Sequence, residues 1–243
     1  MRHRVSEVNI CFKPFKNIHQ GMSAAVMGCG PSLKLYDGQK NIIHVGCNEL
    51  IYSENLDLDY HFVGDAQSDW VDREKTFFKD PEAYNNYTPN IAKFVRNHPQ
   101  DECNIIQANK GRLVDGALHY NVCPMGMTYK AFKQNRQKDF QRDILSNYMY
   151  SQLSISWEMM QFILWTGVSK IYLMGHDCSY REGTVHNPGA RAYGGTPRVG
   201  LITKWGEIKS WIESEYPNVE VMCINPDAMR YFKEVNIDEI VEN

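Results

Sequence analysis

The sequence predicts an α/β protein with a Rossmann-like, mostly parallel sheet flanked by helices and with a flexible lid segment. Three short apolar runs, at 23–28, 41–46 and 60–65, end in Gly or Asp, which is typical of parallel strands buried on both faces. The runs recur at intervals of roughly 18 residues, which leaves room for a short helix between them. Strands and helices that alternate in this way indicate βαβ units.

The first half of the chain alternates between clear strands and irregular sequence. Before residue 23 the pattern is weak, and we expect an arm or an edge element there. Residues 66–90 are polar, aromatic and rich in turn-forming residues, so they are assigned no regular structure. Residues 91–97 and 103–109 are predicted to form two further strands, joined by the turn-forming sequence HPQDE.

Helical sequence precedes the clearest strand of the chain. Residues 130–150 have a helical composition, and residues 151–167 carry a strong apolar face that ends at Gly167, a residue type common at helix ends. The clearest strand is the sequence KIYLMG at 170–175. We therefore expect a buried helix that leads into this strand.

A segment rich in Gly, Pro and Arg follows at residues 181–200. Its length of about 20 residues exceeds that of an ordinary connection, and its glycine content opposes a helix, so we predict a lid. Residues 201–216 return to helical spacing, and residues 219–225 are predicted to form the last strand. Residues 226–235 begin with Pro at a predicted helix entrance.

Length and composition predict one globular domain over residues 1–243. Hydrophobic residues make up 43% and charged residues 23% of the chain, and no apolar stretch is long enough to cross a bilayer. The net charge is -3, from 26 basic and 29 acidic residues, and no basic stripe is present. Nucleic acid is therefore disfavoured as a partner, while the oligomeric state, a homo-oligomer included, stays open.

The cysteines and the N-terminus bear on the compartment. The seven cysteines are scattered, odd in number and without a CxxC pair, which argues against a disulfide framework or a zinc site. The N-terminal sequence MRHRVSEVNICFKPF has basic residues but lacks the apolar core and cleavage site of a signal peptide. We predict a cytoplasmic protein.

The glycine turn GCGPS, at residues 28–32, is the first candidate for ligand binding. Gly28 and Gly30 let the backbone approach a ligand, and Pro31 suits a first helical turn whose free N–H groups attract a phosphate. The same turn is also common as plain strand-to-helix chemistry. Neither the GxGxxG fingerprint nor the P-loop Lys-Ser/Thr is present, so both interpretations stay open.

Polar residues follow three of the predicted strands. Asn48, Asp65 and Asp177 each lie just beyond a strand's carboxyl end, where open α/β sheets bind ligands. Asn48 suits a base or a ribose, and Asp65 suits a hydroxyl or a metal ion. The alternative for each is helix capping. Because several such groups coincide with the glycine turn, the sequence favours a nucleotide site at this sheet edge.

Two histidines and three arginines surround the predicted lid. His176 adjoins the strand and is interpreted as packed or capping, whereas His186 lies where a general base can be brought to a ligand by closure of the lid. Arg181, Arg191 and Arg198 suit a phosphate or carboxylate, or are simply solvated.

A family resemblance supports the nucleotide site. The sequences GCGPSL (28–33), CN (47–48), LSISWEMMQFILWTGVSKIYLMGHD (153–177) and CINPDA (223–228) resemble the bacterial lipooligosaccharide sialyltransferases with a GxGPSL motif. They also resemble the related family that includes MptE-like 6-hydroxymethylpterin pyrophosphokinases and flagellin-modifying proteins. The resemblance is patchy along the chain, and it implies a nucleotide-binding fold with a mobile lid after the late strand.

The resemblance assigns roles to individual residues. It implies that the glycine turn and Asn48 contact the CMP part of a donor, that Ser154 and Ser156 open the long helix beside it, and that the sequence GHDCSY supplies three more groups. The predicted nucleotide-binding residues are Gly28, Cys29, Gly30, Pro31, Ser32, Asn48, Asp65, Ser154, Ser156 and Ser179. The predicted catalytic residues are His186, Asp177 and Tyr180.

The chain departs from the sialyltransferase pattern at three places. The family usually has Asn at the positions of Cys29 and Asp65, and its catalytic histidine falls near residues 198–203, where this chain has none. His186 is the nearby substitute. Asp65 and the displaced histidine argue against close identity with the sialyltransferases.

Three functions stay open. The favoured one is a metal-independent glycosyltransferase that moves a sugar from a nucleotide donor, CMP-linked by resemblance, to the hydroxyl of a glycan or another acceptor. The second is a pyrophosphokinase-like enzyme in which Asp65 and Asp177 hold Mg²⁺ on a nucleotide triphosphate, and the presence of these carboxylates favours it. The third is a nucleotide-binding protein without turnover. The order of lid, late strand and CINPDA favours the first.

Overall fold

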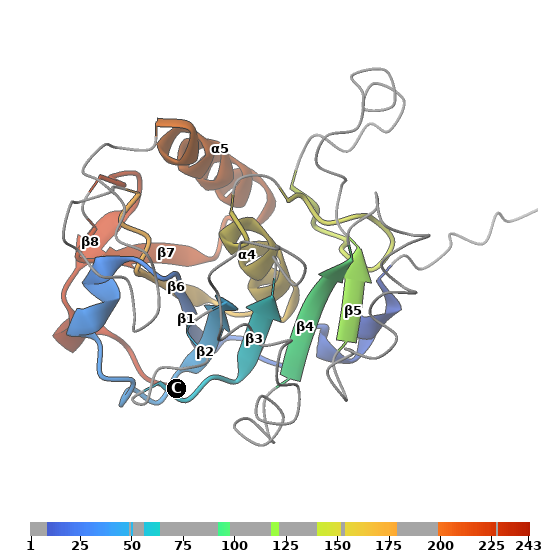
Figure 1. The fold of residues 1–243 in the computed structure, drawn as a ribbon, viewed down its shortest axis with the longest axis horizontal. Coiled ribbons are helices and arrows are strands. Elements are labelled where there is room, and N and C mark those ends of the chain that lie inside the picture. Colours follow the sequence, from blue (N-terminus) through green and yellow to red (C-terminus); the bar gives the residue numbers. More distant parts are fainter. Residues whose placement is uncertain are drawn as a thin grey trace, which may run out of the picture.

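The described part of the chain forms one eight-stranded parallel sheet with helices packed against it (Figure 1). A computed structural model describes residues 9–48, 50, 56–63, 92–97, 118–121, 140–151, 154–178, 199–226 and 228–243. The strand order is β5-β4-β3-β2-β1-β6-β7-β8, and each neighbouring pair is parallel. This architecture confirms the predicted Rossmann-like α/β fold.

Most predicted strands are present. The strands are β1 (Ser23–Met27), β2 (Ile43–Cys47), β3 (Tyr60–Val63), β4 (Ala92–Asn97), β5 (Leu118–Asn121), β6 (Lys170–Met174), β7 (Glu220–Ile224) and β8 (Lys233–Val235). The sequence analysis did not predict β5 or β8. The strand predicted at 103–109 lies outside the described residues.

The order of the strands creates a switch point between β1 and β6. The chain begins at β1, moves outward through β2, β3 and β4 to β5, and then returns to the other side of β1 with β6. From β6 it continues away to β7 and β8. Loops that leave the carboxyl ends of β1 and β6 therefore depart toward opposite halves of the sheet, which is where doubly wound sheets bind ligands.

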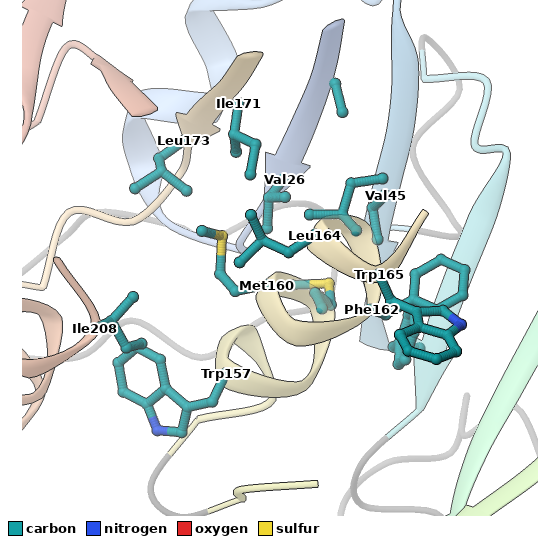
Figure 2. Close-up of a cluster of buried hydrophobic side chains, with 14 of the residues drawn as sticks. Val26, Val45, Trp157, Met160, Phe162, Leu164, Trp165, Ile171, Leu173 and Ile208 are labelled. Carbon is teal, nitrogen blue, oxygen red and sulfur yellow. The ribbon is translucent and has the colours of Figure 1, made fainter. Parts of the chain in front are cut away.

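The larger core lies on the sheet face that carries both described α-helices, α4 (Ser156–Trp165) and α5 (Val199–Glu215). Figure 2 shows side chains of α4 packed against Val26 of β1 and against Ile171 and Leu173 of β6. Alternate residues of the same strands pack into a second core on the opposite face. That face is covered by the 3₁₀ helix η2 (Pro31–Leu35) and by a C-terminal segment that includes η5 (Ile237–Glu239).

Helix α4 is buried on all sides. Each of its ten residues is buried, because the sheet lies under one side and α5 and residues 140–151 cover the other. The helix gives way at Gly167, whose φ of +90° favours glycine, as predicted. The predicted helix at 151–167 is thus confirmed in type but begins only at Ser156.

The N-terminal arm and the C-terminus both pack onto the sheet. The 3₁₀ helix η1 (Ile10–Phe15) places Phe12 in the larger core. At the opposite end of the chain, the Asn243 side chain accepts a hydrogen bond from the backbone N–H of Ser23 at 2.6 Å. Because Ser23 begins β1, the C-terminus lies at the amino-terminal edge of the sheet, away from the switch point.

The helix predicted at 130–150 is wrong in its described part. Residues 140–151 form turns rather than a helix. The buried side chain of Gln161 accepts hydrogen bonds from the N–H groups of Gln141 and Tyr150, at 2.9 and 3.0 Å, and donates to the Tyr150 carbonyl at 2.9 Å. The Asp143 side chain accepts two more backbone N–H groups, those of Leu145 and Ser146. Side chains therefore satisfy the backbone groups that a helix would pair internally.

The helix predicted at 226–235 is also wrong. The described residues of this segment form bends and then β8, whose Val235 is buried beside Ile224 of β7. The N–H of Ala228 donates to the carbonyl of Asp177 at 2.9 Å, which draws the chain across the end of β6. Pairing with the sheet edge outweighs the local preference for a helix after Pro226.

Candidate functional site

The loops that leave β1 and β6 remain hydrogen-bonded to each other beyond the strands. The N–H of Gly28 donates to the Met174 carbonyl at 2.8 Å, and the N–H of Gly30 donates to the Gly175 carbonyl at 2.8 Å. The two loops therefore stay connected over their first residues beyond the strands, before they run to opposite halves of the sheet.

Glycine is required here because the two loops lie too close for a side chain. A Cβ at Gly30 would lie 2.1 Å from Oδ2 of Asp177 and 2.4 Å from the carbonyl oxygen of Gly175. Gly175 itself has a φ of +67°, and its Cβ would lie 2.2 Å from the carbonyl oxygen of Gly28. The glycines of the GCGPS turn are thus explained by loop packing alone, the structural alternative that the sequence left open.

The carboxylate of Asp177 joins the two loops through Ser32. Asp177 is only 4% exposed. Its Oδ2 accepts the backbone N–H of Ser32 at 3.1 Å and the Ser32 hydroxyl at 3.0 Å. Because Ser32 lies in the first turn of η2, a carboxylate of the protein occupies the place where the sequence analysis expected a phosphate.

Asn48 and Cys29 extend this edge toward β2. Asn48 directly follows β2 and has a φ of +47°, a conformation that Asn tolerates better than most residues. The ring of His61 donates from Nε2 to the Asn48 carbonyl at 2.9 Å and so supports this backbone. The Cys29 thiol donates to the Cys47 carbonyl at 3.7 Å, which links the β1 loop to the end of β2.

Ser154, Ser156 and His176 form a chain of hydrogen bonds from the start of α4 into the core. The two serine hydroxyl oxygens lie 2.9 Å apart, and the Ser156 hydroxyl lies 3.3 Å from Nδ1 of His176. Nε2 of the same ring lies 3.1 Å from the carbonyl oxygen of Val26 in β1. The ring of Trp205 from α5 packs edge-on against the imidazole, with centroids 5.1 Å apart.

Burial keeps the imidazole of His176 neutral. Desolvation lowers its pKa from 6.5 to about 4, and the hydrogen bond to the Val26 carbonyl opposes this only in part. The packed role expected for His176 is therefore confirmed, whereas the hydrogen bonds that connect it to Ser156 were not foreseen from sequence.

The structure brings most of the predicted site together. The predicted site residues that lie at this edge are Gly28, Cys29, Gly30, Pro31, Ser32, Asn48, Ser154, Ser156 and Asp177. Asp65, Ser179, Tyr180 and His186 lie outside the described residues, as does the predicted lid up to residue 198. Sequence reasoning missed Gly175, which supports the turn, and Ala228, which ties the β7 loop to Asp177.

No group of three His, Cys, Asp or Glu side chains that could hold a metal ion occurs in the part of the chain that the structure describes. Of the two carboxylates in the magnesium alternative, Asp177 is hydrogen-bonded to Ser32.

Within the same described ranges, no helix combines the length and the apolar composition needed to span a bilayer.

Solved structures share this fold, although no protein-family model matches the chain and no curated protein is significantly similar to it in sequence. The MAf glycosyltransferase from Magnetospirillum magneticum AMB-1 superposes with a TM-score of 0.55 at 12% identity, over 98% of this chain and 39% of that chain. The chain shares the fold of this glycosyltransferase. Because the match covers 39% of the MAf glycosyltransferase, this chain spans about two fifths of the length of that protein.

The sialyltransferase CstII from Campylobacter jejuni is also similar, at lower TM-scores. One CstII structure, in complex with cytidine-5'-monophosphate, has a TM-score of 0.43 at 16% identity over 84% of this chain and 80% of that chain. A second, of a variant in complex with CMP, has a TM-score of 0.48 at 17% identity over 83% of this chain and 81% of that chain.

Replacing Gly30 with alanine tests the close approach of the loops. We expect Gly30→Ala to destabilise the protein by about 3 kcal/mol, because the new methyl group must displace Asp177 or the Gly175 carbonyl. Gly21→Ala is the control: nothing lies within 4 Å of its Cβ position, so only its positive φ is penalised, at about 1 kcal/mol. Denaturant unfolding measures both. Equal effects of the two substitutions would contradict the packing explanation.

The buried His176 predicts a loss of stability in mild acid. Its pKa is about 4 in the folded protein and 6.5 in the unfolded chain, so the unfolded chain binds more protons between these values. The contribution of His176 is fully retained above pH 6.5 and is lost progressively as the pH falls toward 4. We expect it to lower the free energy of unfolding by about 2 kcal/mol between pH 7 and pH 5.

His19 and His44 have pKa values lowered by burial as well and act in the same direction. The measurement is therefore a comparison of wild type with His176→Gln, by urea unfolding at both pH values. An unchanged pH dependence in the variant would show that His176 is protonated normally in the folded state.

Proposed function

We propose that this protein is a glycosyltransferase that moves a sugar from a CMP-linked donor to the hydroxyl of a glycan or another acceptor. The observation that carries the proposal is the gathering of Ser32, Asp177, Ser154 and Ser156 at the β1/β6 switch point, on a fold shared with a glycosyltransferase. Doubly wound sheets bind nucleotides at this position. The sequence resemblance to sialyltransferases with a GxGPSL motif supports the choice of donor.

The charge of Asp177 orients the nucleotide. A phosphate next to this buried carboxylate would meet a like charge, whereas ribose hydroxyls donate hydrogen bonds to carboxylates. The proposed pose therefore has the nucleoside beside Asp177 and Ser32 and the phosphate directed away from them. In this pose Asp177 binds and positions the nucleotide and is not the proton acceptor.

The proposed chemistry is a direct displacement. The acceptor hydroxyl attacks the anomeric carbon, a new C–O bond forms, and the bond from that carbon to the phosphate oxygen breaks, so that CMP leaves with the bonding electron pair. The acceptor proton passes to His186, and the hydroxyls of Tyr180 and Ser179 donate hydrogen bonds to the departing phosphate. These three assignments rest on the sequence interpretation.

Nucleotide binding and turnover test the proposal directly. We expect CMP to raise the melting temperature with or without Mg²⁺, and CMP-sialic acid to be consumed with release of CMP. Stabilisation by ATP that depends on Mg²⁺, without an effect of CMP, would favour the pyrophosphokinase alternative. Binding of CMP without any release from the donor would leave a nucleotide-binding protein without turnover.

Replacing Asp177 with asparagine tests the orientation of the nucleotide. If the ribose lies beside the carboxylate, Asp177→Asn loses a charge-assisted hydrogen bond, and the Kd for CMP rises about tenfold. If the phosphate lies there, removal of the negative charge tightens binding instead. Asp143→Asn, in an exposed turn remote from the switch point, is the matched control, and calorimetric titration measures all three proteins.

Replacing His186 with alanine tests the base. We expect turnover to fall about a hundredfold or more, with the affinity for CMP retained, because the base acts on the acceptor and not on the nucleotide. His19→Ala is the control, since its ring contacts Tyr60 away from the switch point. Unchanged turnover in His186→Ala would remove His186 from the mechanism.

A further inference from the structure

The hydrogen bonds between the core and Ser154 have a fixed direction. The carbonyl of Val26 can only accept, so Nε2 of His176 carries the proton and donates to it at 3.1 Å. In a neutral ring, Nδ1 is then an acceptor, and the Ser156 hydroxyl donates a hydrogen bond to it at 3.3 Å. With its own proton used in this way, the Ser156 oxygen accepts from the Ser154 hydroxyl at 2.9 Å.

The surroundings of His176 leave the ring little freedom. The ring is 7% exposed, and the ring of Trp205 packs against it. The backbone at Gly28 also lies so close to the imidazole that a side chain at Gly28 would contact it. A Cβ at Gly28 would lie 3.0 Å from both Nδ1 and Cε1 of the ring. A flip of the ring about its Cβ–Cγ bond would put carbon atoms in the places of Nδ1 and Nε2 and would therefore break the hydrogen bonds to both Ser156 and Val26.

The fixed direction of these hydrogen bonds extends to Ser154, which is half-buried, whereas Ser156 and His176 are buried. The Ser154 oxygen accepts a hydrogen bond from the backbone N–H of Ser156 at 3.2 Å, and the Ser154 hydroxyl donates a hydrogen bond to the Ser156 oxygen. A hydroxyl oxygen has two lone pairs, so one remains that can accept a further hydrogen bond. Ser154 thus meets a ligand as an acceptor only.

We propose that His176, acting through Ser156, keeps the Ser154 hydroxyl turned as a hydrogen-bond acceptor toward the nucleotide, so that the ligand group bound there is a donor. Either the exocyclic amino group of the base or a ribose hydroxyl supplies this donor. His176 is a positioning residue in this arrangement and does not touch the ligand. The assignment of the ligand rests on the proposed function, whereas the orientation of the hydroxyls does not.

Selectivity follows from the fixed orientation. Cytosine presents an amino group where uracil presents a carbonyl oxygen, and two acceptors that face each other in a buried place leave both unpaired. A free hydroxyl would rotate and serve either base. The network therefore turns a serine, which has no intrinsic preference, into a residue that discriminates between donors and acceptors.

The orientation is tested by the tautomer of His176, read from side-chain ¹⁵N chemical shifts by NMR. We expect a neutral ring protonated at Nε2 near pH 7, and a shift of the Nδ1 resonance in Ser156→Ala, where the hydroxyl that donates to it is removed. Ser23→Ala is a matched control, since Ser23 and Ser156 are both 4% exposed, and it should leave the ring unchanged. A ring protonated at Nδ1 would overturn the proposal.

The ligand assignment is tested by the affinities of wild type for CMP, UMP and 2'-deoxy-CMP. We expect CMP to bind about tenfold more tightly than whichever analogue lacks the donor that Ser154 accepts: UMP if it is the amino group, 2'-deoxy-CMP if it is the ribose hydroxyl. In Ser156→Ala this preference should fall below about threefold, because the Ser154 hydroxyl can then rotate and donate. Ser156→Thr, which keeps the hydroxyl, should restore it.

The proposal would be overturned if Ser156→Ala kept the wild-type preferences for CMP over UMP and over 2'-deoxy-CMP. It would also be overturned if Ser23→Ala lost the preference as much as Ser156→Ala. Failure of wild type to bind any of the three nucleotides would instead contradict the proposed function and remove the ligand assignment, while the tautomer of His176 would still decide the orientation.

Discussion

The carboxylate of Asp177 holds the centre of this molecule together. The carboxylate accepts hydrogen bonds from both the N–H and the hydroxyl of Ser32. The backbone carbonyl of Asp177 accepts the N–H of Ala228, so one residue connects the loops that follow β1, β6 and β7. The contact is possible only because Gly30 and Gly175 allow the loops to approach within a distance that excludes any Cβ.

The core and the site are parts of one packed structure. His176 directly precedes Asp177, yet its ring turns inward, where Trp205 of α5 packs against it and the Val26 carbonyl of β1 accepts a hydrogen bond from Nε2. Its other nitrogen meets Ser156, the first residue of α4. Figure 2 shows the apolar packing of α4 and of Ile208 from α5 at the sheet. Because Ser156 is the first residue of α4, this packing also fixes where its hydroxyl group lies.

Sequence reasoning succeeded where local pattern and buried environment agree. The runs that became β1, β2, β3, β4, β6 and β7 are apolar enough to be recognised, and Gly167 marks the end of α4 as expected. It failed at residues 140–150, which have helical composition but are held in turns by Gln161 and Asp143, and after Pro226, where pairing of β8 with β7 prevails. In both places a partner outside the local segment, Gln161 in one and strand β7 in the other, supplies contacts that a local pattern does not contain.

The sequence by itself determined the parallel α/β fold and the position of polar groups at the strand ends, because buried strands and glycine turns leave local signatures. Only the tertiary structure decided what those groups do: that Asp177 takes the helix end where a phosphate was expected, and that His176 orients the serines at the start of α4. These outcomes depend on contacts such as Ser32 to Asp177, which join residues 145 positions apart in the sequence. The packing of the whole sheet brings such residues together in space.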